Sequence, residues 1–203
     1  MIMDLSFEHP LADQDFSEED FRDVNWQGGI FTRCRFRHCH MEELQTVNCQ
    51  FIDCDFTGAF FNASMHRGTA YTNCKFQDAN LFVSRFENCK MVGSDFDGAK
   101  MDGFTITGGD WSYTNLRHTD LSRQNLKGIK LREAELIGAS LEKSDLREAD
   151  LTRVQLSGAK LAGADLRGAN TDGIDFRHVD VKGARMDMIQ AVTFLRSFGA
   201  KVD

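Results

Sequence analysis

The sequence predicts an all-β fold, a right-handed quadrilateral β-helix that ends in a short α-helix. Three patterns predict it: an apolar residue at every fifth position, a small residue two positions before it, and a glycine two positions after many of these residues. The apolar series runs from Phe16 to Met186 without a change of register. A fixed internal period of this kind is typical of solenoid proteins.

The period of five excludes the two common regular structures. A straight α-helix turns ~100° per residue, so residues five apart would scatter around its axis. A flat strand alternates its faces, so an odd period would place successive apolar residues on opposite sides. A chain that turns a corner after every five residues keeps them all on the inside. Four corners then close a coil of 20 residues, and we expect coils to stack ~4.8 Å apart.

The inward positions predict both the core and the role of the cysteines. Residues 20 apart should stack in columns, and one column reads Phe16, Phe36, Phe56, Phe76, Phe96, Leu116, Leu136, Leu156 and Phe176. All six cysteines occupy the small inward position: Cys34, Cys39, Cys49, Cys54, Cys74 and Cys89. Because their spacing follows the repeat, we interpret them as buried reduced thiols and not as metal ligands or disulfides. Reduced thiols fit a cytoplasmic protein.

His66 is the one histidine at a central inward position, where it should lie between Thr46 and Phe86. A catalytic or ligand-binding role would need a partner, and the spacing supplies none. We therefore interpret His66 as a hydrogen-bonded structural residue in a small polar defect of the core, or as a local outward bend.

The ends of the chain depart from the repeat. We expect residues 1–15 to form an N-terminal cap or a first partial coil, residues 16–186 the β-helix, and residues 187–203 a C-terminal helix and tail. Ile189 and Phe194 lie off the main apolar stripe of this helix, which gives it more apolar surface than capping needs. We expect a twofold homodimer joined there, and its interface residues are Met188, Ile189, Val192, Leu195 and Phe198.

Charge and composition limit the classes of function. The net charge of −7 argues against direct nucleic-acid binding, and neither a signal peptide nor a membrane span is expected. Residues 1–20 account for this whole charge, because they hold seven carboxylates and no Lys or Arg. No motif for a catalytic triad, a phosphate-binding loop or a metal site is present, so we expect no enzyme, no catalytic residue, no metal and no cofactor.

One face carries a recurring acidic residue just before the central position: Asp15, Asp55, Asp95, Glu135 and Asp175. These side chains should point outward. Solubility and turn preference explain them simply. The alternative is a row of carboxylates that imitates DNA phosphates and binds a protein partner, although Arg35 and Lys75 interrupt the row.

The segments 149–153 (ADLTR) and 164–168 (ADLRG) show the repeat in its clearest form. With them the chain resembles the pentapeptide-repeat family. Residues 64–70, 73–76, 89–94 and 183–194 also resemble the MfpA and Qnr fluoroquinolone-resistance proteins. That resemblance implies a dimeric DNA mimic that binds a type II topoisomerase, DNA gyrase or topoisomerase IV, and gives resistance to quinolones or gyrase toxins. Unlike Qnr proteins of Gram-negative bacteria, this repeat has no interrupting loop. The alternative is an interaction scaffold for another protein partner, with its site at exposed residues such as Phe60, Met65 and Phe82.

Overall fold

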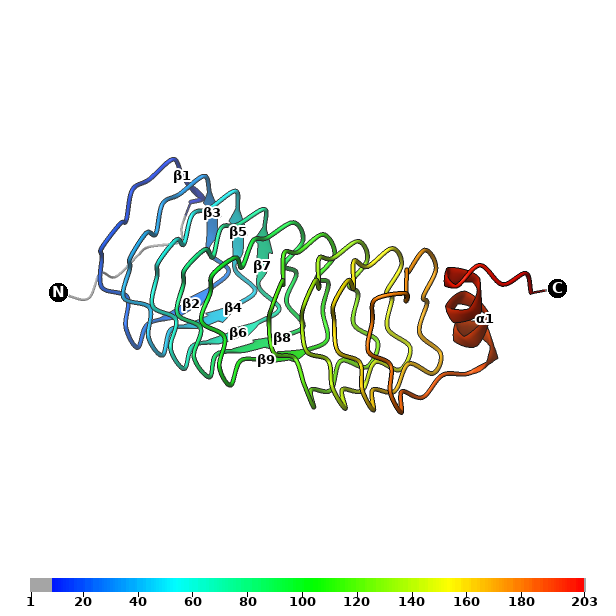
Figure 1. The fold of residues 1–203 in the computed structure, drawn as a ribbon. Coiled ribbons are helices and arrows are strands. Elements are labelled where there is room, and N and C mark those ends of the chain that lie inside the picture. The colour runs from blue at the N-terminus through cyan, green and yellow to red at the C-terminus, as the bar shows by residue number, and fades with distance from the viewer. Residues whose placement is uncertain (1–8, 203) are drawn as a thin grey trace. The chain divides into compact units, whose positions relative to one another are not determined.

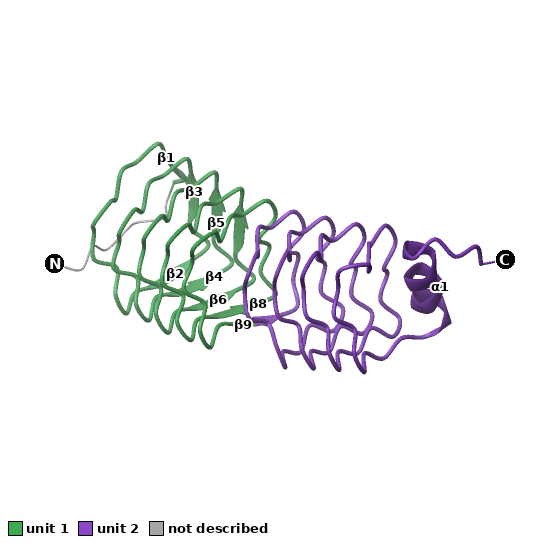
Figure 2. Ribbon diagram, in the orientation of Figure 1, with its two compact units in different colours: residues 1–105 green, residues 106–203 purple. Residues whose placement is uncertain are grey.

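The computed structural model describes residues 9–202, and the chain divides into two compact units, residues 1–105 and 106–203 (Figure 2). Both units are built from the same coil of 20 residues (Figure 1).

Unit 1 contains two sheets of very short parallel strands. One sheet has the order β1 (Leu11–Ala12), β3 (Ile30–Thr32), β5 (Gln50–Ile52) and β7 (Ala70–Thr72). The other has the order β2 (Asn25–Gln27), β4 (Gln45–Val47), β6 (Met65–Arg67) and β8 (Arg85–Glu87), and β9 (Thr105–Thr107) begins at the last residue of the unit. Each strand pairs with residues 20 positions further along, as Phe31 does with Phe51. The remaining two sides are held by isolated bridges in the same register, Asp15 to Arg35 and Asp20 to His40. The coil is therefore four-sided.

Unit 2 repeats this architecture with bridges in place of strands. Its four sides are marked by the pairs Asp110 to Lys130, Asn115 to Glu135, Asp120 to Ser140 and Asn125 to Asp145, all parallel and 20 residues apart. The helix α1 (Met188–Ser197) follows the last coil. The predicted right-handed quadrilateral β-helix with a C-terminal helix is confirmed.

The interior consists of the predicted columns. In unit 1 the rings of Phe16, Phe36, Phe56, Phe76 and Phe96 stack with successive centroid distances of 5.1, 5.0, 5.0 and 4.8 Å. In unit 2 the same position holds Leu116, Leu136, Leu156 and Phe176, each at most 4% exposed. Each such side chain contributes about 1.5–3 kcal/mol by burial, so the shaft itself stabilises the fold.

The conformation and surroundings of the corner residues explain why some corners have glycine and others do not. Every fifth residue from Asp13 to Gly173 has a positive φ, whether or not it is glycine. Glycine is needed where the preceding coil covers the corner. A Cβ on Gly58, whose φ is +67°, would lie 2.4 Å from the ring of His38. The left-handed conformation is thus imposed by the coil, and the close approach of a neighbouring side chain decides where only glycine fits.

The helix α1 closes the end of unit 2. Asp187 caps it by accepting the N–H of Ile189 at 3.0 Å, and Gln190 accepts the N–H of Asp187 at 2.9 Å, which forms a capping box. The Gln190 amide also donates to the Ala169 carbonyl at 2.8 Å. The ring of Phe194 packs against Phe176 at 5.7 Å. The expectation that Phe194 is surplus to capping is therefore wrong, because this ring covers the open end of the core column.

No helix in the described part of the chain has both the length and the apolar character that a membrane span requires.

Candidate functional site

The recurring Asp and Asn residues have a structural role at the corners. Each stands just before a central residue, and its side-chain oxygen accepts the backbone N–H two residues later. Asp15 accepts the N–H of Ser17 at 3.1 Å, and Asp95 that of Asp97 at 3.0 Å. This is an Asx-type turn, which Asp and Asn favour because their short side chains reach the backbone. Turn preference thus accounts for their frequency.

In unit 1 the predicted acidic face alternates in sign. Asp15, Arg35, Asp55, Lys75 and Asp95 follow one another along the same side, bridged coil to coil. Arg35 forms an ion pair with Asp15 at 2.9 Å. The Ser17 hydroxyl and N–H, followed by Arg35, lower the pKa of Asp15 to about 2. This carboxylate is ionised at neutral pH but its charge is balanced locally.

The other two acids of unit 1 also have donors. Arg37 forms an ion pair with Asp55 at 2.6 Å, and the Gln77 amide donates a hydrogen bond to the Asp95 carboxylate at 2.7 Å. Asp55 is only 8% exposed, because its carboxylate lies beneath Arg37 and Thr57 at the surface. Burial raises the pKa of Asp55, but the bonds from Thr57 and Arg37 outweigh it and leave the pKa lowered.

In unit 2 the same side has neutral residues between the acids. Glu135 and Asp175 alternate with Asn115 and Gln155 along the sequence register. Arg117 pairs with Glu135 at 2.7 Å, and Arg177 with Asp175 at 2.5 Å. Hydrogen bonds from Arg177 lower the pKa of Asp175 to about 2. Both carboxylates stay partly exposed, at 35% and 50% of their side-chain surface, and each is paired with a surface arginine.

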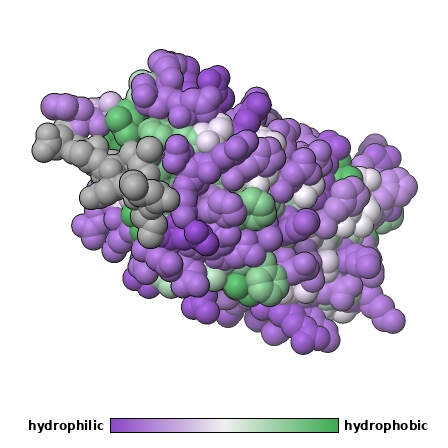
Figure 3. Space-filling model, turned by 90° about the vertical axis from the view of Figure 1, so that its left-hand side faces the viewer, coloured by the Kyte–Doolittle hydropathy of each residue, from purple (hydrophilic) through white to green (hydrophobic). Residues whose placement is uncertain are grey.

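The acidic N-terminal segment is partly balanced as well. Asp13 pairs with Arg33 at 2.7 Å, and Asp20 pairs with Arg22 at 2.7 Å. Asp4 and Glu8 lie outside the described residues. The face shown in Figure 3 is largely hydrophilic, with small hydrophobic areas between hydrophilic residues.

An apolar patch interrupts one side of unit 1. Phe60, Phe82 and Val83 are 36%, 49% and 39% exposed. They come from consecutive coils, because Phe60 bridges to Asn80 and the Phe82 carbonyl accepts the N–H of Ala63. Met65, expected with them, is half-buried in β6.

His66 lies at the centre of a buried polar network in unit 1. Its Nδ1 is 2.7 Å from the Thr46 hydroxyl and 2.9 Å from the Tyr71 hydroxyl, and its Nε2 is 2.9 Å from the Ser64 hydroxyl. Burial lowers the pKa of His66 to about 3, so the ring is neutral at physiological pH. The structural interpretation is confirmed, and the partners that the spacing did not reveal are hydroxyls of the adjacent inward positions.

The six cysteines are free and buried, as expected. Burial raises the pKa of the Cys39 and Cys89 thiols to about 12, which keeps both protonated and unreactive. Within the described residues, no group of three or more His, Cys, Asp or Glu side chains is arranged to hold a metal ion.

The helix α1 presents an unpartnered apolar face. Met188, Ile189, Leu195 and Phe198 are 80%, 72%, 46% and 57% exposed, and Val192 is half-buried. These five are the residues expected at a dimer interface. Their exposure is consistent with that expectation.

Comparisons with known proteins gave a match to one family of repeat proteins and matches to solved structures. The family model described as pentapeptide repeats matches residues 72–108, 114–153 and 155–187 in eight copies. A trypsin-treated form of QnrB1, described as a plasmid-mediated fluoroquinolone resistance protein, superimposes with a TM-score of 0.81 at 23% identity, over 96% of this chain and 98% of that one. A second trypsin-treated form gives a TM-score of 0.71 at 21% identity, over 96% and 97% of the two chains. A search of curated protein sequences gave no match.

At these identities the structural likeness concerns the fold. The family match covers more than half of the chain and falls in the register of the structural repeat. The protein therefore belongs to the pentapeptide-repeat family.

Proposed function

We propose that this protein binds a type II topoisomerase, DNA gyrase first, by imitating DNA, and thereby protects it from quinolones or from gyrase-directed toxins. The observation that carries the proposal is the near full-length superposition on a fluoroquinolone resistance protein. The repeat supplies a rigid surface. The hydroxyl–imidazole pair of Ser64 and His66 is completely buried inside the coil, so a substrate does not reach it. The function therefore resides in binding.

The net negative charge of the protein supports attraction to a basic surface on the partner. The net charge of −7 becomes −14 in a dimer, and such a charge favours association with a cationic surface at low ionic strength. Along the side of Asp15 in unit 1 the carboxylates recur at every second coil, about 9.6 Å apart if coils are ~4.8 Å apart. Duplex DNA has a charge every ~1.7 Å, so the imitation is partial, and its contact residues are Asp15, Asp55, Asp95, Glu135 and Asp175.

A homodimer joined through α1 belongs to this proposal. Four large apolar side chains of the helix face solvent. In contrast, Gln190 donates a hydrogen bond to the Ala169 carbonyl, and Phe194 packs against Phe176 at the end of the core. A second copy of the same face would cover them. The partner acts inside the cell, so we place the protein in the cytoplasm.

The test is a gyrase supercoiling assay, titrated with this protein, with and without a fluoroquinolone. Inhibition or rescue, weakened by added salt and by competing DNA, is the expected result. The variant Asp95→Asn removes a charge and keeps the oxygen that accepts the Asp97 N–H, so it should weaken the effect without unfolding. Asp120→Asn is the matched control, because it makes the same change on another side of the coil, where Asp120 accepts the N–H of Ser122. No effect of the folded parent in either arm contradicts the proposal.

A second candidate is an interaction scaffold with a different protein partner. The patch of Phe60, Phe82 and Val83 favours it, because large exposed apolar groups on a rigid surface mark contact sites. The variant Phe82→Ser separates the two candidates: gyrase inhibition should persist in the DNA mimic, and binding of a partner at this patch should be lost.

A further inference from the structure

Four basic side chains of unit 2 surround one shallow hollow of about 330 Å³, on the side of the coil that carries Asp145 and Asp165. They are Lys143, Arg147, Arg167 and Arg185. The coils that contribute them are adjacent, because Asp145 bridges to Asp165 and Asp165 bridges to Arg185. Four positive and two negative charges therefore meet here, which is a local excess of two positive charges in a chain whose net charge is −7.

The two carboxylates of the hollow lie beneath the arginines. Arg147 donates to Asp145 from Nε at 2.8 Å and from Nη2 at 2.6 Å, and Arg167 binds Asp165 with the same two distances. The side chains of Asp145 and Asp165 are only 28% and 16% exposed, whereas those of the two arginines are 43% and 42% exposed. These charge-assisted pairs fix the guanidinium planes and cover the negative charge, so the surface of the hollow is positive.

The remaining cations of the hollow have little compensation. Arg185 is 62% exposed and lies 3.6 Å from Asp165, whose oxygens already accept three hydrogen bonds from Arg167. Lys143 is exposed and forms no ion pair with a described residue. Arg147 and Arg167 occupy the same position of adjacent coils, so their like charges repel each other. A bound anion would remove this repulsion.

The donors and the charge of the hollow define the chemistry of its occupant. A guanidinium has five N–H donors, and each aspartate takes only two of those of Arg147 or Arg167. Gly163 lines the hollow without a side chain and leaves it open. A carboxylate would bring one negative charge, whereas a phosphate monoester carries about −1.5 to −2 at neutral pH on three acceptor oxygens. We infer that this hollow is a binding site for the phosphate group of a small phosphate monoester.

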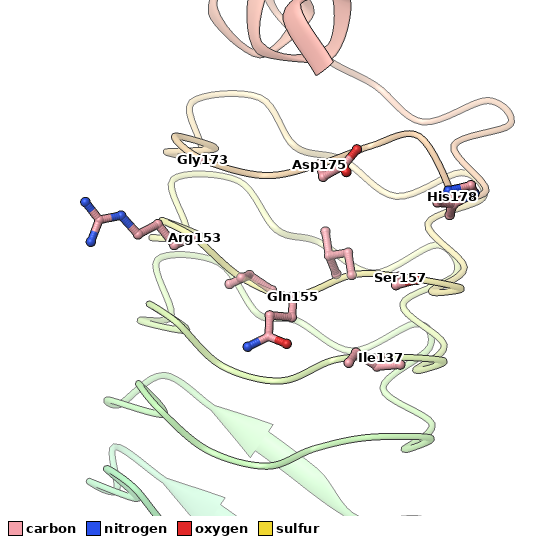
Figure 4. Close-up of a pocket in the computed structure, with 9 residues that line it drawn as sticks. Ile137, Arg153, Gln155, Ser157, Gly173, Asp175 and His178 are labelled. Carbon is pink, nitrogen blue, oxygen red and sulfur yellow. The ribbon is translucent and has the colours of Figure 1, made fainter. Parts of the chain in front are cut away.

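A second cavity of unit 2 lacks such a grouping of cations. It has a volume of about 270 Å³, lies between the last two coils and has one arginine in its lining, Arg153 (Figure 4). Arg153 points away from Asp175 and His178 (Figure 4) and forms an ion pair with Glu133 at 3.5 Å. The grouping of cations around the hollow of Lys143 is therefore not a general feature of the cavities of this unit.

The phosphate site does not depend on the proposed binding of gyrase. Asp165 and Arg167 lie ten residues before Asp175 and Arg177, and ten residues are two sides of the coil, so the two pairs lie on opposite sides. The hollow shares no residue with the proposed contacts of the DNA mimic. Lys143→Gln should weaken phosphate binding and keep the effect on gyrase supercoiling, so the two proposals can fail separately.

The first test is a titration of the full chain with glycerol phosphate at constant ionic strength, followed by NMR of the backbone amides. Saturable shifts of the Gly163 and Arg185 amides are expected, and sodium chloride should not reproduce them. Lys143→Gln and Arg167→Gln should each weaken binding about tenfold. Both variants should fold, because Lys143 is exposed at a corner and Asp165 keeps its bond from the backbone N–H of residue 167.

Arg177→Gln is the matched control for Arg167→Gln. Arg177 binds Asp175 through Nε and Nη2, as Arg167 binds Asp165, but it lies on the opposite side of the coil. Its loss should leave phosphate binding unchanged. Equal weakening by Arg167→Gln and Arg177→Gln, unchanged binding in Arg167→Gln, or no saturable shift in the parent would overturn the inference.

The second test compares glycerol phosphate with sulfate at pH 7.5 and 5.0. A phosphate monoester takes up a proton with a pKa of ~6, so its binding should weaken about fivefold or more at the lower pH, whereas sulfate stays a dianion and should bind equally at both. The hollow itself keeps its charge, because hydrogen bonds from Arg167 lower the pKa of Asp165 to about 2 and those from Arg147 also lower the pKa of Asp145. Equal weakening of both anions, or glycerol phosphate binding that ignores pH, would overturn the inference.

Discussion

Protonation of His66 should couple the stability of unit 1 to pH. The pKa of this buried ring is lowered to about 3, whereas the unfolded chain binds the proton with a pKa of ~6.5. Between these values the unfolded state holds one more proton than the folded state. Stability is therefore fully present above pH ~6.5 and is lost as the pH falls toward 3. Integrated from pH 6.0 to 4.5, the loss from this one group is about 2 kcal/mol.

The assay is urea unfolding of the parent and of His66→Gln at pH 6.0 and 4.5. Glutamine keeps one hydrogen-bonding side chain in the cavity but removes the titration. The parent should lose about 2 kcal/mol more than the variant over this interval, because the carboxylates contribute equally to both. Tyr71→Phe is the control: it removes one hydroxyl near His66 Nδ1, costs about 1 kcal/mol and retains the slope. If the parent and His66→Gln lose the same free energy, the ring is protonated within the fold and the reasoning fails.

Three further predictions concern the corner, the core and the end of the fold. Gly58→Ala should destabilise the protein more than Gly28→Ala in thermal unfolding, because both have a φ of +67° but only the former would meet the His38 ring, and equal melting would contradict the close-approach argument. Leu136→Lys should abolish cooperative folding by circular dichroism, because it places a charge in the apolar shaft at a cost of several kcal/mol; a melt like that of the parent would refute the inward assignment. Leu195→Glu should give a folded monomer in sedimentation, because the side chain is 46% exposed in the isolated chain; an unchanged dimer would exclude α1 as the interface.

The period of five was sufficient to predict the interior. It identified the Phe16 column, the inward thiols and the position of His66, because each of these depends only on which residues share a side of the coil. The start of the helix was also predictable, because the last repeat ends at Met186 and the helix begins at Met188, directly after its capping residue Asp187.

The surface was less predictable, for a physical reason. The repeat fixes where a side chain starts but not which way a long arginine turns, so Arg37 reaching Asp55 across one coil could not be foreseen. One local signal was available: arginine two positions after aspartate, as in Asp175 and Arg177, places the guanidinium beside the carboxylate. The corner at His178 lacks the positive φ of the preceding corners. The sequence does not signal this change, because the residues there still follow the repeat.

Inward and outward positions follow each other with a period of five residues, and this period determines which insertions the fold can tolerate. In most folds an insertion of five residues within a strand disrupts packing. Within unit 2, five extra residues at a corner would leave every inward position occupied by a residue of the same kind, since the interior repeats with that period. All surface residues downstream would move by a quarter turn to the next side. A single small duplication could thus bring a whole set of charged side chains to a new side of the shaft in one mutational event, with little loss of core stability.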